Sequence, residues 1–159
     1  MKKTAPPTKD GKKIVVSNRR ARHEYDIQES VEAGVVLTGT EIKSIRDGRV
    51  QIQDAFARVD NGEVWLHGMH IAPYAQGNRF NVEPDRPRKL LLHRREIERL
   101  FSKATERGLA LIPLDLHLRH GFAKIELAIA KGRKLYDKRE AIAEREAKRD
   151  QDRAMSERH

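Results

Sequence analysis

The sequence has 159 residues, a formal net charge of +9, 38% hydrophobic residues and no cysteine, which suits one domain with tails and excludes disulfides and thiolate metal sites. The positive charge favours nucleic acid over a membrane as the partner, because no apolar run approaches the width of a bilayer. The absence of cysteine and of a secretory signal fits a cytoplasmic location.

Composition divides the chain into three segments. Residues 1–13 are rich in Pro, Lys and Gly and are expected to form a disordered basic arm. Residues 14–130 contain enough apolar side chains for one modest core. Residues 131–159 carry dense charge of both signs and lack the apolar stripe that a helix needs for packing. We therefore expect a charged tail that becomes helical only on a partner.

The first elements of the domain are a strand and a short helix. Residues 23–37 mix β-branched and polar side chains and predict a long strand, bent at Gly34. Thr38 stands three residues before Glu41, which is the spacing of a capping box. A short helix is therefore predicted here, ending near Gly48.

The Asn-Gly pair at residues 61–62 predicts the turn of a β-hairpin. A turn of two residues would place Arg58 opposite Trp65, in a cation–π geometry. The same register would place Asp60 beside Glu63, which is unfavourable, so a longer loop remains an alternative.

Residues 72–88 contain three prolines and a glycine and are expected to be irregular. A helix is predicted over residues 93–107, because apolar side chains recur at a spacing of three and four, and Gly108 suits the position after its end.

Two strands with clean alternation follow, over residues 111–120 and 122–131. The side chains expected to face inward are Leu114, Leu116 and Leu118 on the first strand and Ile125, Leu127 and Ile129 on the second. Those expected to face outward are Asp115, His117 and Arg119, then Phe122, Lys124 and Glu126. Strands outnumber helices, which indicates a compact antiparallel barrel of OB type with helices at its ends. A split βαβ layout is the alternative.

The sequence offers no candidate for catalysis. It contains neither a glycine-rich phosphate motif nor a nucleophile elbow. His67 and His70 are three residues apart on a strand, as are His117 and His120, so the members of each pair face opposite sides and cannot share a metal. Asp115 and His117 share a face without a nucleophile beside them. We expect no enzyme activity, no cofactor and no metal, and we interpret the histidines as surface or RNA-facing.

The sequence contains three basic segments, and each has a ring or an apolar side chain among its cations. Such segments can bind phosphates and stack on bases. They are residues 18–25 with Arg19, Arg20, Arg22 and His23, residues 86–93 with Lys89 and Leu91, and residues 131–139 with Lys131, Arg133 and Tyr136. Lys124 and Phe122 add a cation and a ring on the last strand. Because no sequence-reading motif of an RRM or KH domain is present, we expect recognition of the shape of a folded RNA.

Four segments together resemble one protein family. NRRARHEY, VEAGVVLTGTEIKSIRDGRV, NVEPDRPRKLLLHRREI and AKGRKLYDKRE closely resemble the small protein B family, the SsrA-binding proteins of bacterial trans-translation. The resemblance runs from about Lys13 to Glu140. It implies a closed six-stranded OB-type barrel with packed helices and a tail that is unstructured in solution.

The resemblance also implies a non-enzymatic adaptor that binds the tRNA-like domain of transfer-messenger RNA and delivers it to stalled ribosomes. Its tail would enter the empty mRNA channel of the small subunit, beside 16S rRNA at the decoding centre. Elongation factor Tu and alanyl-tRNA synthetase would be partners through the charged RNA, whereas DNA and membranes would not be partners. A structural ribosomal protein with an OB core and a basic extension is the alternative.

Matching positions imply two sets of contact residues. The set that meets the RNA is Asn18, Arg22, His23, Glu32, Leu91 and Lys124. Leu91 would be a stacking wedge, Lys124 a phosphate cation, and Glu32 a buried acceptor for base or 2′-hydroxyl donors. The set that matches the decoding-centre segment is Gly132, Lys134, Tyr136, Asp137, Lys138 and Arg139. Many family members have histidine at Tyr136, so a ring is retained here but an ionisable imidazole is not.

Overall fold

The structure is a computed structural model that describes residues 11–75, 81–132, 146–151 and 153, and this part of the chain is mainly β with few helices. The strands are β1 (Lys12–Ser17), β2 (Tyr25–Val35), β3 (Val50–Gln51), β4 (Phe56–Asp60), β5 (Glu63–His67), β6 (His70–Ile71), β7 (Arg88–Leu91), β8 (Ala110–Arg119) and β9 (Phe122–Gly132). The helices are α1 (Arg19–Glu24), α2 (Gly39–Arg46) and α3 (Arg94–Glu106). Residues 146–151 and 153 are also helical, and their side chains are exposed.

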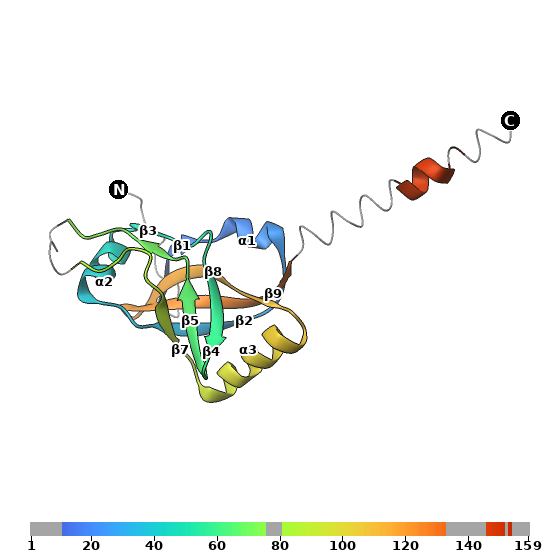
Figure 1. Ribbon diagram of the computed structural model, residues 1–159. Coiled ribbons are helices and arrows are strands. Elements are labelled where there is room, and N and C mark those ends of the chain that lie inside the picture. The colour runs from blue at the N-terminus through green and yellow to red at the C-terminus, as the bar shows by residue number, and fades with distance from the viewer. Residues whose placement is uncertain (1–10, 76–80, 133–145, 152, 154–159) are drawn as a thin grey trace.

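The main sheet is antiparallel, in the order β1-β8-β4-β5-β7-β2-β9, and β8 also pairs with β9. The series of pairings that starts at β8 and passes through β4, β5, β7, β2 and β9 therefore returns to β8. Strands β3 and β6 form a separate small pair. Figure 1 shows how strongly the long strands β2, β8 and β9 curve around one another.

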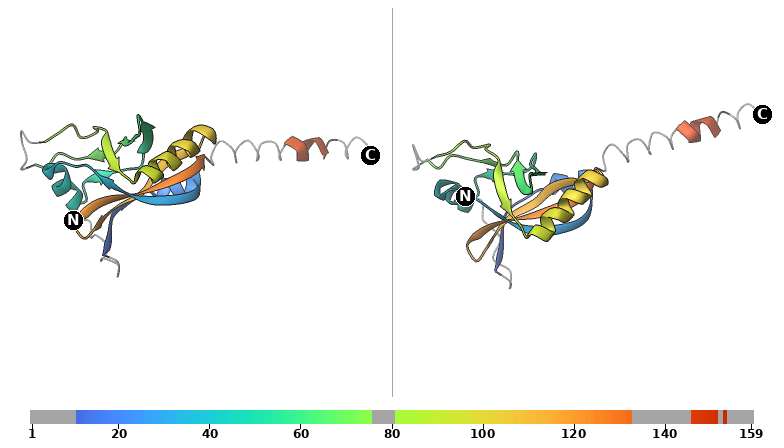
Figure 2. Two further views of the ribbon diagram at one scale, coloured as in Figure 1. Left: turned by 90° about the horizontal axis from the view of Figure 1, so that it is seen from below. Right: turned by 60° about the horizontal axis from the view of Figure 1, so that its bottom comes forward.

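The helices lie at different places around the sheet. Helix α1 packs on β2 and β8, whereas α3 contacts β4, β8 and β9. Both views of Figure 2 place α2 at the end of the sheet away from α3. Among the described residues, no helix is long and apolar enough to cross a membrane.

Apolar side chains from every long strand meet in one core. Val64, Leu66 and Leu116 are fully buried, and the burial of each such side chain contributes roughly 1.5–3 kcal/mol. Ile125 and Leu127 of β9 are also fully buried, as the alternation along that strand predicts. A smaller cluster on the other side of β8 and β9 consists of Ala21, Ile112, Leu114 and Ala128.

Short-range signals in the sequence predict their elements correctly. Thr38 Oγ1 accepts a hydrogen bond from Glu41 N at 3.3 Å, and Glu41 Oε1 accepts one from Thr38 N at 2.9 Å, so the capping box begins α2. Asn61 and Gly62 have φ values of 50° and 75°, as a tight two-residue turn requires. The longer hairpin loop is therefore excluded, and Asp60 pairs with Glu63.

The N-terminal part differs from the prediction. The expected arm overlaps β1, which begins at Lys12, and the expected strand over 23–37 begins only at Tyr25. His23 belongs to α1, which starts because Asn18 accepts a hydrogen bond from the Ala21 amide at 3.2 Å. The irregularity in β2 lies between Ile27 and Glu29 in its pairing with β9, and not at the predicted bend.

The expected cation–π pair across the hairpin is replaced by another. Arg58 does lie opposite Trp65 in the register. Its guanidinium, however, lies 5.6 Å from the centre of the Phe56 ring, two residues away on the same strand. Phe56 in turn stacks on His67, with ring centres 5.4 Å apart.

Strand β8 breaks the predicted alternation. The register with β9 shifts between Pro113 and Asp115, so Leu114 packs in the smaller cluster and Leu116 in the main core. Asp115 and His117 were expected on the surface, but they are 5% and 0% exposed. Strands β1 and β9 flank this half of β8 and place Ile14 and Lys124 on the two sides of His117.

Candidate nucleic-acid interface

Three strands bring Leu91, Gly34 and Lys124 into one row. Gly34 of β2 pairs with Leu91 of β7 on one side and with Lys124 of β9 on the other. A Cβ atom built at Gly34 would lie 3.2 Å from Leu91 Cβ and 3.7 Å from Lys124 Nζ. The glycine therefore lets an aliphatic side chain and a cation come together from residues 33 positions apart in the sequence.

This row exposes apolar surface next to cations. Leu91 is 53% exposed and Phe122, two residues before Lys124 on β9, is 72% exposed. Lys89 projects on the same side of β7 as Leu91, and it lies 3.7 Å from Glu63 in a surface ion pair. Apolar and aromatic groups beside amines suit stacking on bases together with contact to phosphates.

A buried polar network adjoins the row through Glu32, two residues before Gly34 on β2. Glu32 Oε2 accepts a hydrogen bond from Arg119 Nε at 2.9 Å and lies 2.8 Å from His117 Nε2. The other ring nitrogen of His117, Nδ1, lies 2.6 Å from Asp115 Oδ1. Lys12 Nζ lies 3.6 Å from Asp115 Oδ2. We name these five residues the Glu32–His117 network.

The network shifts two pKa values in opposite directions. Burial alone would raise the pKa of Glu32, but the hydrogen bonds from His117 and Arg119 outweigh it and lower this pKa. Burial alone would lower the pKa of His117, but its contacts with Asp115 and Glu32 outweigh it and raise this pKa. Both shifts favour an ionised carboxylate beside a protonated imidazole.

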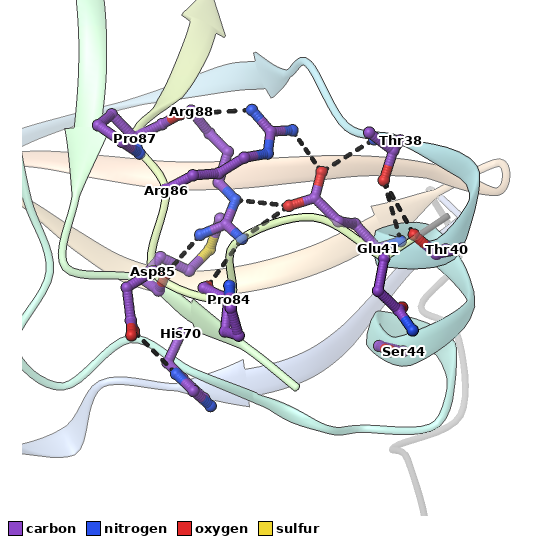
Figure 3. A network of polar contacts seen from close by, with 12 residues as sticks. Thr38, Thr40, Glu41, Ser44, His70, Pro84, Asp85, Arg86, Pro87 and Arg88 are labelled. Carbon is purple, nitrogen blue, oxygen red and sulfur yellow. Dashed lines mark hydrogen bonds and ion pairs between the residues drawn. The ribbon is translucent and has the colours of Figure 1, made fainter. Parts of the chain in front are cut away.

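A second buried network holds strand β7 in place. Arg88 is completely buried, and its Nε and Nη2 donate to Glu41 Oε2 at 2.8 and 2.7 Å. Arg88 also donates to the carbonyls of Met69 and Pro84, and Arg86 donates to the other carboxylate oxygen of Glu41. Figure 3 shows both arginines converging on Glu41 at the start of α2.

The contacts of Glu41 keep its carboxylate ionised and hold strand β7. Burial alone would raise the pKa of Glu41, but hydrogen bonds from Arg86, the Thr38 amide and Arg88 lower it. Side chains alternate along β7, so Arg88 points inward while Lys89 is on the outward side. The ion pair of Arg88 with Glu41 therefore holds the strand that carries Leu91.

The basic residues of α1 lie elsewhere. Arg19, Arg22 and His23 are exposed on that helix, and Arg20 forms an ion pair with Glu24 at 2.8 Å. The helix leads into Tyr25, which pairs with Gly132 at the end of β9 opposite to Lys124. Strands rise about 3.3 Å per residue, so α1 and the Leu91 row are separated by roughly 25 Å.

The predicted RNA-contacting residues therefore form two groups. Leu91, Lys124, Lys89 and Glu32 lie together, whereas α1 lies where the tail leaves the sheet. Asn18 is 1% exposed, and its amide donates to the carbonyls of Pro113 at 3.1 Å and Ile52 at 3.4 Å. These bonds give Asn18 a structural role, and its expected contact with the RNA stays a prediction.

Part of the predicted tail site is outside the described residues. Lys131 and Gly132 end β9 and are exposed, with Lys131 paired to Asp26 in the register. The remaining tail candidates are not described; they are Arg133, Lys134, Tyr136, Asp137, Lys138 and Arg139.

A cavity of about 550 Å³ lies between α1, β4, α3 and β8. Its lining includes Arg20, Arg58, Phe56 and Phe101, and both phenyl rings are exposed, at 39% and 50%. It is separate from the Leu91 row. Within the part of the chain that the structure describes, no group of three or more histidines and carboxylates is arranged to hold a metal.

Sequence reasoning missed the residues that depend on distant partners. His117 and Arg119 meet Glu32 across 85 and 87 positions, and Arg88 meets Glu41 across 47. One signal was available for Arg88, because it stands two residues before Leu90 and would share the face of a strand with this apolar side chain, where a charge needs a buried partner.

Comparisons with known proteins agree on one family. The profile described as SmpB protein matches residues 15–157. An SsrA-binding protein from Carboxydothermus hydrogenoformans is 58% identical over 147 residues, covering 92% of this chain and 99% of the relative. One from Moorella thermoacetica is 60% identical over 147 residues, covering 92% and 95%.

A solved structure is also similar. It is described as "tmRNA-SmpB: a journey to the center of the bacterial ribosome", and it matches with a TM-score of 0.63 and 48% identity over 74% of this chain and 82% of that one.

Proposed function

Because the chain belongs to the SmpB protein family, we propose that it is a non-enzymatic adaptor that binds the tRNA-like domain of transfer-messenger RNA and delivers it to stalled ribosomes. The relatives are named for binding SsrA RNA, and the similar structure joins tmRNA, SmpB and the ribosome in its description. Elongation factor Tu and alanyl-tRNA synthetase would be met through the charged RNA, in the cytoplasm.

The observation that carries the proposal is the row of Leu91, Gly34 and Lys124. Leu91 would stack against an unpaired base or ribose, and Lys124 would neutralise a phosphate. Glu32 would accept a hydrogen bond from a base or a 2′-hydroxyl group. No base-reading motif accompanies these groups, so recognition of RNA shape is the expected mode.

We also infer that the main sheet is a closed OB-type barrel, since the pairing of β8 with β9 joins the two ends of the β8-to-β9 series. Strand β1 would then lie outside this ring on β8. A closed sheet has no free edge and so provides a rigid support for an RNA-binding face.

The tail has a separate role in this proposal. It would enter the empty mRNA channel of the small subunit and become helical there, with Arg133, Lys134 and Tyr136 at the decoding centre. The described part of the distal tail, residues 146–151 and 153, is helical with exposed side chains. These residues are thus helical without a partner, which differs from the expectation that the tail is helical only when bound, and their lack of a packed face suits contact with a polyanion.

The decisive experiment is to purify the full chain from bacterial cells and sequence the RNA that travels with it. Transfer-messenger RNA at near-equal amount supports the proposal. Co-purification of complete small subunits at one copy each would instead support a structural ribosomal protein. Binding to the purified RNA should weaken about a thousandfold between 50 and 200 mM salt if about six phosphates are neutralised. An affinity that barely changes with salt would contradict this interface.

A further inference from the structure

His117 is a completely buried titratable residue inside the candidate interface, and neither the fold nor the stacking and phosphate contacts account for its chemistry. Its side chain is 0% exposed, whereas that of its partner Glu32 is 31% exposed. The imidazole thus lies directly beneath a carboxylate that reaches the surface, next to the row of Leu91, Gly34 and Lys124.

The contacts of His117 define its protonation state. Nε2 lies 2.8 Å from a Glu32 oxygen and Nδ1 lies 2.6 Å from an Asp115 oxygen. Ionised carboxylates only accept hydrogen bonds, so both ring nitrogens have to donate, and a ring with two N–H groups is an imidazolium. Burial between two carboxylates favours this charged form over either neutral tautomer.

The charged groups around the ring come from four strands. Asp115 and Arg119 belong to β8, Glu32 to β2 and Lys12 to β1. Lys124 of β9 is the register partner of His117 itself. With His117 protonated, the Glu32–His117 network contains two carboxylates and three cations, and Glu126 of β9, the register partner of both Asp115 and Glu32, adds a carboxylate beside it. Loss of this one proton would remove the cation that lies between Glu32 and Asp115.

Both contacts of Glu32 involve the same carboxylate oxygen. Among the described residues, both His117 and Arg119 contact oxygen Oε2 of Glu32. The carboxylate plane is thereby held, and no residue that the structure describes bonds its other oxygen, Oε1, which can therefore accept from a donor on the RNA. A carboxylate compensated in this way can face an RNA without repelling its phosphates.

We propose that His117 is a positioning residue for RNA binding, acting as a buried imidazolium that orients Glu32 and neutralises it so that its Oε1 can accept a hydrogen bond from the RNA. This inference rests on the proposed function. RNA affinity would then depend on the protonation of His117 beneath the interface. Affinity should fall as the pH rises through the pKa of His117, which lies above the ordinary value of 6.5.

The test uses the full chain and a fluorescent transcript of the tRNA-like domain of transfer-messenger RNA, with Kd measured at constant salt from pH 6.5 to 9. His117→Gln should weaken binding about tenfold at pH 7, the scale of one charge-assisted hydrogen bond, and should flatten the pH profile. In a Glu32→Gln background, His117→Gln should add little further loss, because the histidine acts through the glutamate.

His70→Gln is the matched control. His70 also pairs with a carboxylate, Asp85, at 2.8 Å, but at an exposed site outside the Glu32–His117 network. Its Kd and pH profile should equal those of the wild type. If His117→Gln retains wild-type affinity and pH profile, or if its loss simply multiplies with that of Glu32→Gln, the inference is overturned.

A second measurement on the free wild-type protein covers the case in which His117→Gln does not fold. The nitrogen chemical shifts of the His117 ring should report both nitrogens protonated at pH 6.5, the ordinary value above which its pKa lies, and Glu32→Gln should lower the pKa of that ring. A neutral tautomer at pH 6.5 would overturn the inference even if the RNA binds. Failure of the wild-type chain to bind this RNA at any pH would reject the proposed function, while the ring measurement would still decide the protonation of His117.

Discussion

Gly34 and Leu91 are cross-strand partners that approach so closely that a Cβ atom at position 34 would lie 3.2 Å from the Cβ atom of Leu91. A side chain at position 34 therefore requires Leu91 to move by a few tenths of an ångström, whereas Lys124 Nζ, at 3.7 Å, would be in ordinary van der Waals contact. The glycine sets the spacing between the two groups that the RNA is proposed to meet.

Gly34→Ala should weaken RNA binding several-fold and leave the midpoint of thermal unfolding within a few degrees of wild type. The methyl group displaces Leu91, while the reduced flexibility of the unfolded chain offsets part of the strain. Gly39→Ala is the control, because a Cβ atom at position 39 would meet nothing within 4 Å. Fluorescence anisotropy and thermal unfolding of both variants test this. Equal affinities for the two variants would contradict the proposed role of Gly34.

Lys124→Ala should weaken RNA binding and reduce the slope of log affinity against log salt concentration by about 1, as expected when one phosphate contact is lost. The fold should remain stable, because the amine of Lys124 is not part of the core. Arg107→Ala removes the same charge at the far end of α3, about 20 Å along that helix from the Leu91 row. The control should change neither the slope nor the unfolding temperature, and identical slopes in both variants would exclude Lys124 as a contact.

The sequence predicts best what depends on neighbours in the chain. The capping box of Thr38 and Glu41 and the turn at Asn61 and Gly62 need only a few consecutive residues, and both occur as predicted. The alternation along β9 was sufficient to place Lys124 on the outer face, because no irregularity interrupts its pairing with β2 from Glu29 to Gly34.

The errors arise where a distant segment decides the environment. Asp115 and His117 alternate like surface residues, but β1 and β9 place neighbours on both sides of them and Glu32 supplies a charge partner for His117. Helix α1 was not predicted, and its last two residues were assigned to the following strand, because the stability of the helix depends on Asn18 bonding to carbonyls 34 and 95 positions away. Local propensity contains no information on such partners.

Glu41→Gln should lower the free energy of unfolding by about 3 kcal/mol, since it leaves the fully buried Arg88 without a charged partner. Glutamine still completes a capping box, so the loss reports the arginine contacts and not the cap. Glu96→Gln makes the same change in the cap of α3, where Glu96 accepts from the His93 amide at an exposed site. Urea denaturation should show less than 1 kcal/mol for this control, and similar losses in both variants would refute the role of the buried ion pairs.

Acid should destabilise the protein through Glu41 and Glu32. The pKa of each lies below the ordinary value of 4.5 in the folded state, so their stabilisation is complete above that value and is lost as the pH falls through the folded pKa. His117 has a raised pKa and so contributes in the opposite sense: its stabilisation is complete below the ordinary value of 6.5 and is lost as the pH rises through the folded pKa. Urea denaturation between pH 3 and 9 should therefore give a maximum between the ordinary pKa values of 4.5 and 6.5. In Glu41→Gln, the acid limb of this curve should be shallower. If the variant loses stability with falling pH as steeply as the wild type, carboxylates other than Glu41 cause the acid destabilisation.

Truncation after Gly132 should leave binding to the tRNA-like domain within about twofold of wild type and abolish peptide tagging on stalled ribosomes. Gly132 is the last residue of β9 and pairs with Tyr25, so this cut preserves the whole strand that contains Lys124. RNA affinity and tagging in a reconstituted translation system are the two measurements. A large loss of RNA affinity would refute the separation of the two activities.

The inward amide of Asn18 has a practical consequence for mapping this surface. In a mutational scan scored only by RNA capture, the loss of a contact at Asn18 would look the same as the release of the start of α1 from the carbonyls of Ile52 and Pro113. The two effects are separated only when the folded fraction of each variant is measured alongside its binding.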